Sequence, residues 1–237
     1  MTKNPQPANW VEYNQRVHAE KSLALDYSNA ESQGQILQAQ TFGIAIEAGG
    51  PLGNKRCLDI GCGRGQLALA LAAFQAREVV GVDIVAESII AFRERYPHVK
   101  WEIGSPDDEQ FCRRLGLFDV IFVIELLQLV EWQKSFQILW NQVAPGGRLV
   151  VIVPNKDNPI VQKTIARFEG TYTAPNPTEL SALVAELPDV NSWAYRGMDF
   201  QQEQTIVPYA TSPWTNSIIE GFDSNRLVIV VQKKITG

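Results

Sequence analysis

The sequence predicts an α/β fold, a doubly wound and mostly parallel sheet of seven strands. Short apolar segments alternate with helical segments from residue 56 to residue 153, the order that builds a parallel sheet. The first apolar segment runs into alternating glycines at positions 61, 63 and 65, which is typical of a strand that turns sharply into a helix. In such a sheet a ligand binds at the carboxyl ends of the strands, so we expect the functional residues at that edge.

The elements are expected in the following order. Residues 1–32 are polar and weakly periodic and are expected to form one or two short helices, and Gln33 to Glu47 should form a longer one. Pro145-Gly146-Gly147 is expected to stop a later helix, and Asn176 with Glu179 resembles a capping box. The expected strands are 56–60, 78–83, 99–103, 118–124, 148–153, 190–196 and 227–233, and the expected helices among them are 66–75, 86–96, 107–115, 133–143, 159–168 and 177–187.

We expect residues 1–237 to form one domain with three parts. Residues 1–50 would be a helical lid, residues 55–155 the cofactor-binding core, and residues 156–237 a C-terminal part with a substrate lid. The lid is placed in the long insertion before the last strand, residues 197–225, because a parallel strand ending at Arg196 delivers the chain to the ligand edge.

Composition limits the partners of this chain. With a net charge of −5 and scattered basic residues, no surface is predicted to attract nucleic acid. No apolar run is long enough to span a membrane and no signal peptide is evident, so we expect a cytoplasmic protein. Three cysteines and two histidines form no metal-ligand pattern, and no metal is expected. The oligomeric state is not predicted.

The glycine-rich turn and a later carboxylate predict a nucleoside-bearing cofactor. The glycines let a ligand approach the main chain, and Asp83 at the end of the second strand can accept hydrogen bonds from ribose hydroxyls. Dinucleotide sites prefer G-x-G-x-x-G, whereas this chain has G-x-G-x-G preceded by Asp59. A carboxylate there would repel a pyrophosphate but suits an ammonium and a sulfonium, which favours S-adenosylmethionine over a nicotinamide cofactor and its reductases. The alternative is that the glycines only allow close packing of helix and sheet.

Three segments carry a resemblance to a known family. They are Cys57 to Gly65 with Val79 to Asp83, Phe118 to Leu127, and Leu139 to Val151, and together they resemble the class I S-adenosylmethionine-dependent methyltransferases with their Rossmann-like fold. The resemblance implies that Asp59 and the glycine turn bind the methionine end and that Asp83 binds the ribose. The cofactor-binding residues it implies are Asp59, Gly61, Cys62, Gly63, Gly65, Asp83, Ile84, Ser105, Pro106, Asp107, Ile124 and Tyr27.

The end of the fourth strand should face the reacting methyl group. Related small-molecule O-methyltransferases often have Glu-x-Leu-Glu-His-Val there, but this chain has Glu125 to Val130 with Leu129 in place of the histidine. That position therefore supplies no base. Glu125 either orients the methionine ammonium or caps the next helix, and His18 is the other candidate catalytic residue. The signature of enzymes that methylate the exocyclic amines of nucleic-acid bases is absent from this segment.

We therefore expect methyl transfer to an oxygen, nitrogen or carbon nucleophile of a small-molecule metabolite, mainly by aligning donor and acceptor. The alternative is a regulatory or scaffold protein that binds S-adenosylmethionine without transferring its methyl group. Aromatic residues in the irregular segments are expected to line the acceptor, although such residues are more often core. They are Tyr13, Tyr172, Tyr209 and Trp214.

Overall fold

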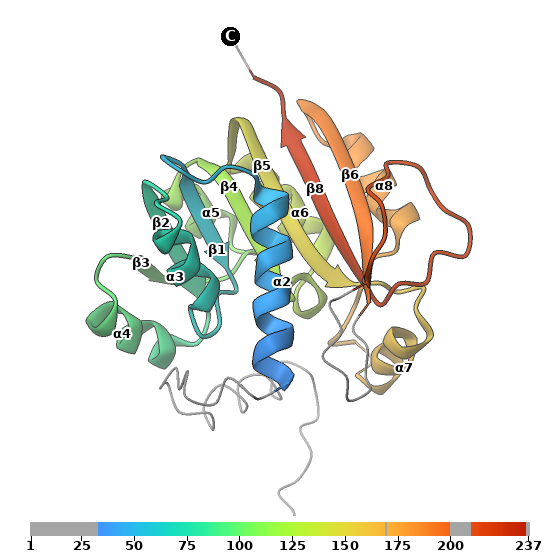
Figure 1. Cartoon of the computed structure of the whole chain (residues 1–237), viewed down its shortest axis with the longest axis horizontal. Coiled ribbons are helices and arrows are strands. Elements are labelled where there is room, and N and C mark those ends of the chain that lie inside the picture. Colours follow the sequence, from blue (N-terminus) through green and yellow to red (C-terminus); the bar gives the residue numbers. More distant parts are fainter. Residues whose placement is uncertain (1–32, 169, 200–209, 236–237) are drawn as a thin grey trace, which may run out of the picture.

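The computed structural model describes residues 33–168, 170–199 and 210–235 (Figure 1). These residues form one eight-stranded sheet with the order β3-β2-β1-β4-β5-β8-β6-β7. The strands are β1 (Arg56–Ile60), β2 (Glu78–Asp83), β3 (Lys100–Ile103), β4 (Phe118–Ile124), β5 (Val143–Pro154), β6 (Val190–Asp199), β7 (Ala210–Thr211) and β8 (Arg226–Lys233).

Strand direction matches the predicted doubly wound sheet. Strands β1 to β5 pair in parallel, and β8 is antiparallel to both β5 and β6, so β6 runs in the same direction as the first five. The seven predicted strands are confirmed. The additional strand, β7, is a two-residue segment that pairs with Met198 and Asp199 at the outer edge of β6.

Helices cover both faces of the sheet (Figure 1). Apolar side chains of α2, α3 and α4 form one core against the sheet, and those of α5, α6 and α8 form a second core on the opposite face. Both cores consist mainly of Val, Ile, Leu and aromatic side chains, as expected for strands buried on both faces. The helices are α2 (Gln33–Gly49), α3 (Gln66–Ala73), α4 (Ala86–Arg95), α5 (Glu109–Leu115), η2 (Leu127–Leu129, a 3₁₀ turn), α6 (Trp132–Asn141), α7 (Pro159–Arg167) and α8 (Pro177–Glu186).

The expected helix stop at Pro145-Gly146-Gly147 is wrong, because these residues lie inside β5. Helix α6 ends at Asn141, and the chain enters β5 almost at once, with a shift of register against β4 between Phe118 and Val120. Gly147 approaches β4 closely, since a Cβ there would lie 2.8 Å from the carbonyl oxygen of Asp119. The glycine pair therefore permits a bulge in a strand rather than the end of a helix.

The end of β6 and the start of α8 are two further boundaries that the sequence predicted. The strand expected to end at Arg196 continues to Asp199, where β7 and the start of β8 provide further pairing. The capping box is confirmed, because the Asn176 side chain accepts a hydrogen bond from the Glu179 N–H and the Glu179 side chain accepts one from the Asn176 N–H.

None of the helices in the described part of the chain is long and apolar enough to cross a membrane.

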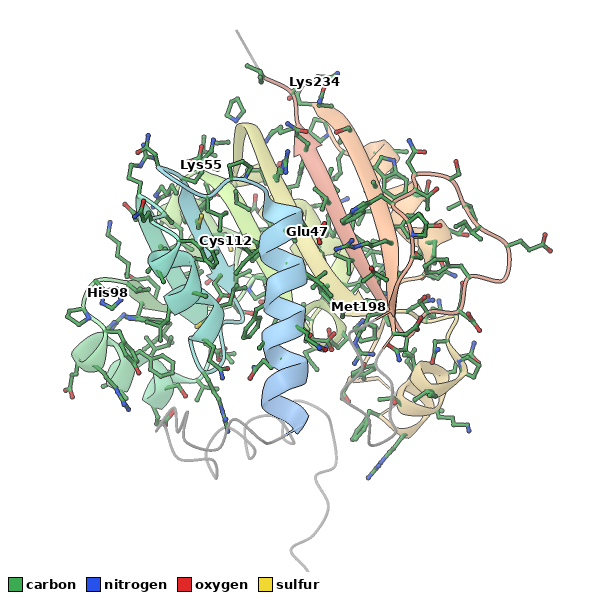
Figure 2. All side chains as sticks on the ribbon, viewed as in Figure 1. Glu47, Lys55, His98, Cys112, Met198 and Lys234 are labelled. Carbon is green, nitrogen blue, oxygen red and sulfur yellow. The ribbon has the colours of Figure 1, made fainter. Side chains whose placement is uncertain are left out.

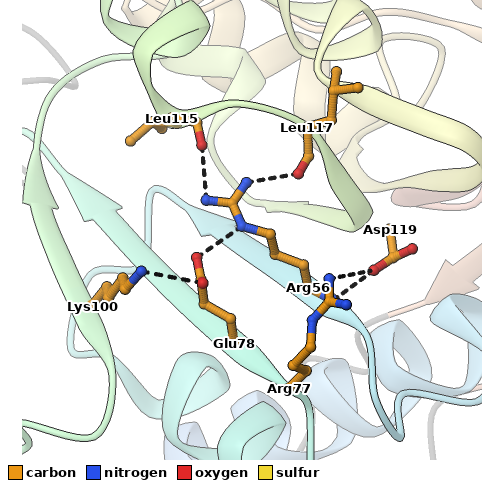
Figure 3. Close-up of polar contacts among 7 residues, drawn as sticks. All are labelled: Arg56, Arg77, Glu78, Lys100, Leu115, Leu117 and Asp119. Atoms are coloured by element: carbon orange, nitrogen blue, oxygen red, sulfur yellow. Dashed lines mark hydrogen bonds and ion pairs between the residues drawn. The ribbon is translucent and has the colours of Figure 1, made fainter.

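Charged residues connect the strands at their amino ends (Figure 3). The Arg56 guanidinium pairs with Glu78 at 2.8 Å and donates hydrogen bonds to the carbonyl oxygens of Leu115 and Leu117. It also lies 4.1 Å from the centre of the Phe118 ring. Arg56 therefore connects β1 to β2 and to the turn before β4.

Asp119 extends this network of charges. Its carboxylate accepts a hydrogen bond from the Arg56 backbone N–H and lies within ion-pair distance of Arg77 (Figure 3). Lys55 lies 3.9 Å from the same carboxylate. Figure 2 shows Lys55 at the upper edge of the sheet and Met198, near the end of β6, at the opposite edge. The amino ends of the strands are thus stabilised by paired charges, and the carboxyl ends lie at the other side of the molecule.

Candidate active site

The glycine-rich turn is attached to the end of β2 by backbone hydrogen bonds. The N–H groups of Gly61 and Cys62 donate to the carbonyl oxygen of Val82, at 2.8 and 2.9 Å. The Gly63 N–H donates to the Asp83 carboxylate at 2.8 Å. These bonds hold the glycine-rich turn after β1 against the end of β2, at the carboxyl edge of the sheet.

All three glycines of the turn have a left-handed backbone, with φ of +77° at Gly61, +52° at Gly63 and +71° at Gly65. Two of them also have a packing reason within the protein. A Cβ at Gly61 would lie 2.8 Å from Leu126, and one at Gly65 would lie 2.6 Å from Trp101. Close packing against Leu126, in the segment after β4, and against Trp101 of β3 thus accounts in part for these two positions, alongside the sharp turn itself.

Asp59 lies just before the turn with its side chain buried. One carboxylate oxygen accepts a hydrogen bond from the Ala68 N–H in α3, at 3.0 Å. Burial raises the pKa of this carboxyl to about 7; the Ala68 hydrogen bond opposes the increase, and nearby Asp83 adds to it. A positively charged group placed beside Asp59 would be stabilised by the ionised form, and the ionised form by that group.

Asp83 ends β2, and both of its carboxylate oxygens accept backbone hydrogen bonds, one from Gly63 and one from Val85 at 3.0 Å. Each oxygen retains further acceptor capacity, which two hydroxyl groups could use. The neighbouring Ile84 is 60 % exposed, unusual for an isoleucine. A polar acceptor beside an exposed apolar side chain is the arrangement that a ribose with its base requires.

The residues expected beside the base lie in the turn after β3. Helix α5 is capped by Asp108, whose carboxylate accepts a hydrogen bond from the Phe111 N–H at 2.9 Å. Ser105 and Pro106 therefore lie in the turn before this cap, and the helix begins at Glu109, two residues later than expected. Asp107 is partly buried in the same turn.

The end of β4 holds the expected catalytic carboxylate in an unusual conformation. Ile124 ends the strand, and Glu125 follows with φ of +53°, which few residues other than glycine adopt. The Glu125 N–H donates to the Ile152 carbonyl oxygen, and the carboxylate pairs with Arg226 at 2.5 Å. Glu125 thus connects β4 to the start of β8 and neither caps η2 nor begins it.

Two further side chains lie beside Glu125. Gln128 donates hydrogen bonds to the Glu125 carbonyl oxygen and, at 3.4 Å, to its carboxylate. Gln128 is 2 % exposed, and within the described part of the chain its side-chain amide oxygen (Oε1) has no hydrogen-bond partner. Tyr172 is also buried; burial raises the pKa of its hydroxyl, and Glu125 adds to the increase while Arg226 opposes it. The structure thus brings Glu125 and Tyr172 together.

Leu129 occupies the position where the related sequences have histidine. It packs against an apolar cluster from α7 and the segment after it, formed by Val161, Phe168, Tyr172 and Ala174. A leucine there completes this small core, and a charged imidazole would leave a polar group within it.

Other expected residues are placed elsewhere or lie outside the described residues. Trp214 lies with its ring centre 4.5 Å from the guanidinium of Arg196, at the outer edge of β6.

The sequence did not predict two residues that lie beside Glu125, Arg226 and Gln128. The last strand was expected to begin one residue after Arg226, and only its antiparallel pairing with β5 brings that side chain to Glu125. Tyr13, His18, Tyr27 and Tyr209 lie outside the described residues.

Comparison with known proteins identifies the family. Residues 57–147 match the family model described as a methyltransferase domain. The chain is 30 % identical to a ubiquinone biosynthesis O-methyltransferase of Bordetella parapertussis over 198 residues, 76 % of this chain and 81 % of that protein. The chain belongs to the class I S-adenosylmethionine-dependent methyltransferases.

Two other similarities differ in extent. A ribosomal protein L11 methyltransferase of Ralstonia pickettii is 36 % identical, but over 41 % of this chain and 32 % of that protein. The solved N-methyltransferase NodS of Bradyrhizobium japonicum, in complex with S-adenosyl-L-homocysteine, superposes with a TM-score of 0.62 at 17 % identity. It covers 93 % of this chain and 98 % of that chain, and it confirms the fold of this methyltransferase.

Proposed function

We propose that this S-adenosylmethionine-dependent methyltransferase acts on a small-molecule metabolite, with an oxygen, nitrogen or carbon atom as the methyl acceptor. The observation that carries the proposal is the extent of the match to the Bordetella protein, which is named for ubiquinone biosynthesis and is similar beyond the cofactor-binding core. The similarity to the L11 methyltransferase, whose name indicates a protein substrate, covers less than half of this chain.

The residues at the carboxyl edge suit the donor. The acidic groups of Asp59 and Asp83 would bind the methionine ammonium and the ribose hydroxyls, and Ile84 would contact the adenine. Ser105, Pro106 and Asp107 would line the other side of the base. The sulfonium supplies an already activated methyl group, so the protein has mainly to align the acceptor with it and to exclude water.

Glu125 would act here as a positioning residue rather than as a general base. Its carboxylate is engaged by Arg226, and Gln128 holds its backbone carbonyl in place. The Glu125 and Arg226 pair lies between the end of β4 and the start of β8, where it would form part of the wall of the acceptor site together with Tyr172.

The domain organisation remains part of this proposal. Residues 1–32 and 197–225 would close over donor and acceptor, although residues 1–32 and 200–209 lie outside the described residues. The described part of the second segment follows the outer edge of β6, where Thr215 and Tyr195 exchange two backbone hydrogen bonds. Hydrogen exchange with and without S-adenosylhomocysteine and acceptor should show protection in both segments. Equal exchange in the two states would place the lid elsewhere, with residues 155–177 as the next candidate.

The substrate class can be tested by tracing the methyl group. The protein is incubated with S-adenosylmethionine labelled in its methyl group and a metabolite extract, and in parallel with extracted protein and RNA. We expect label in the small-molecule fraction. Label confined to protein or RNA would contradict the proposal while leaving the methyltransferase activity itself intact.

A further inference from the structure

Gln128 is one of two buried glutamines in the part of the chain that the structure describes, and it lies beside the proposed acceptor site. It is the middle residue of η2, the turn that follows β4. Its backbone carbonyl oxygen accepts a hydrogen bond from the Thr173 N–H at 3.0 Å, so the segment next to Tyr172 lies against this turn. Gln128 is therefore held between the end of β4 and the segment after α7.

Glu125 fixes the orientation of the Gln128 side-chain amide. The amide nitrogen donates to the Glu125 backbone carbonyl oxygen at 2.9 Å and to the Glu125 carboxylate at 3.4 Å. Turning the amide over would place its oxygen against these two groups, and neither a carbonyl nor a carboxylate has a hydrogen to donate. The nitrogen therefore stays on the side of Glu125, and Oε1 lies on the other side of the amide.

The Oε1 atom of Gln128 is buried and has no hydrogen-bond partner among the described residues. A buried amide oxygen without a donor costs free energy, because it has lost its hydration and gained nothing in return. The other buried glutamine differs. With its amide nitrogen oriented to donate, Gln142 reaches the carbonyl oxygens of Cys112 and Gly116, both at 3.2 Å. Gln128 thus offers a hydrogen-bond acceptor that the described protein groups leave unused.

The charges around Gln128 indicate which ligand group suits this oxygen. The cluster opens to solvent on the side of Glu125, whose side chain is 32 % exposed, and the Arg226 guanidinium is already paired with the Glu125 carboxylate. A ligand group that approaches Oε1 therefore meets an amide oxygen with a carboxylate beside it. A hydroxyl or amino group can donate a hydrogen bond to Oε1, whereas a carboxylate or phosphate would be repelled.

We propose that Gln128 determines acceptor specificity: its side-chain oxygen accepts a hydrogen bond from a hydroxyl or amino group that lies beside the methylated atom of the acceptor. This inference rests on the small-molecule function proposed above and adds to it a chemical class, an acceptor with a hydrogen-bond donor of its own. A site that pairs with such a group rejects an analogue that lacks it more strongly than an apolar pocket does. Glu125 is then a positioning residue, because it orients the amide of Gln128.

The experiment measures how methyl transfer depends on the amount of acceptor. The full chain is incubated with S-adenosylmethionine labelled in its methyl group and with serial dilutions of a metabolite extract. Methionine has nearly the size of glutamine without its amide, so for Gln128→Met we expect the half-saturating amount of extract to rise roughly tenfold. The affinity for S-adenosylhomocysteine, measured by calorimetry, should stay within about twofold of that of the unmodified protein. A merely structural role would instead lower the maximal rate and the melting temperature.

Gln142→Met is the matched control, since Gln142 is also buried but lies at the end of α6, where it accepts the N–H of the first residue of β4 at the amino edge. It should alter neither the half-saturating amount of extract nor the affinity for S-adenosylhomocysteine. The labelled product gives a second test that needs no variant and decides alone if Gln128→Met does not fold. Mass spectrometry with deuterium exchange and fragmentation should locate an exchangeable hydrogen on a hydroxyl or amino group of this product.

Two outcomes would overturn the proposal. One is an unchanged dependence on extract in folded Gln128→Met, as expected if an ordered water satisfies Oε1. The other is a product without any hydroxyl or amino hydrogen. Both outcomes leave the label in a small molecule, whereas label confined to protein or RNA would contradict the proposed function itself.

Discussion

The two edges of the sheet differ in how their charged residues are satisfied. At the amino edge, Arg56 pairs with Glu78 and donates to two carbonyl oxygens (Figure 3). Asp119 there pairs with two basic side chains, Lys55 and Arg77. At the carboxyl edge, buried Asp59 pairs with no basic side chain of the residues that the structure describes, and Glu125 occupies a left-handed backbone conformation.

This difference shows a division of roles between the two ends of the same strands. Paired charges at the amino edge connect β1 to β2 and β4. Strained or incompletely paired groups at the carboxyl edge cost free energy in the ligand-free protein, and they persist where a ligand can compensate for that cost. Variants at matched positions of the two edges should therefore separate stability from binding.

The largest effect is expected for Gly63→Val. A β-branched residue at φ of +52° is strained, and its side chain would enter the space that the donor must approach, so S-adenosylhomocysteine should bind at least about 100-fold more weakly. Calorimetry measures the affinity and circular dichroism the fold. Gly221→Val is the control, because Gly221 has φ of +71° with open space around it. Retained binding in Gly63→Val would reduce the loop to a packing turn.

A smaller loss is expected for Asp83→Ala, about 1.5–3 kcal/mol of binding free energy for S-adenosylhomocysteine, because a charged hydrogen-bond acceptor is lost. Asp119→Ala is its counterpart at the amino edge, where the carboxylate also accepts a backbone N–H. That variant should lower the free energy of unfolding by about 1 kcal/mol and leave binding unchanged. Calorimetry showing the same affinity for Asp83→Ala as for the unmodified protein would remove Asp83 from the ribose site.

The affinity for S-adenosylhomocysteine should depend on pH through Asp59. Its pKa of about 7 means that the carboxyl is largely protonated at pH 6, so affinity for a ligand with an ammonium should rise by up to about tenfold per pH unit and level off above about pH 7. The stability of the ligand-free protein should change with the opposite sign. Because the folded state holds the proton to higher pH than the ordinary value of 3.8, the free energy of unfolding falls between that value and about 7.

Asp59→Asn tests both parts of this prediction, since it should flatten both pH profiles over the same range. Titration calorimetry and denaturant unfolding at pH 5.5 to 8 supply the two measurements. A pH-dependent affinity that persists unchanged in Asp59→Asn would assign the titration to another group.

The smallest effect is expected for Arg77→Ala at the amino edge. The Arg77 guanidinium lies 3.8 Å from the Asp119 carboxylate, and its side chain is 58 % exposed, so water and salt screen the pair. The free energy of unfolding should change by no more than about 0.5 kcal/mol, and binding of S-adenosylhomocysteine should not change. A loss of more than about 2 kcal/mol in urea unfolding would show that the charges of this edge act as one network.

Much of the fold follows from local sequence, and the errors in the expectation have physical causes. The strands at 56–60, 78–83 and 118–124 were predicted to the residue, because apolar runs there are bounded by glycine or by charged residues. The start of β5 was not predicted correctly, because Pro145-Gly146-Gly147 is compatible both with the end of a helix and with a bulge in a strand. The pairing of β5 with β4, which is far away in the sequence, decided between these two outcomes.

The sequence by itself determined the sheet, the cofactor class and the residues adjacent to the glycine turn, because a strand, its turn and the next strand are close along the chain and their chemistry is local. Only the tertiary structure placed Arg226 against Glu125, 101 residues apart in sequence, and packed Leu129 against α7 and the segment after it. Whether two residues far apart in the sequence form a hydrogen bond or an ion pair depends on how the strands and helices pack, and their spacing along the chain does not determine that.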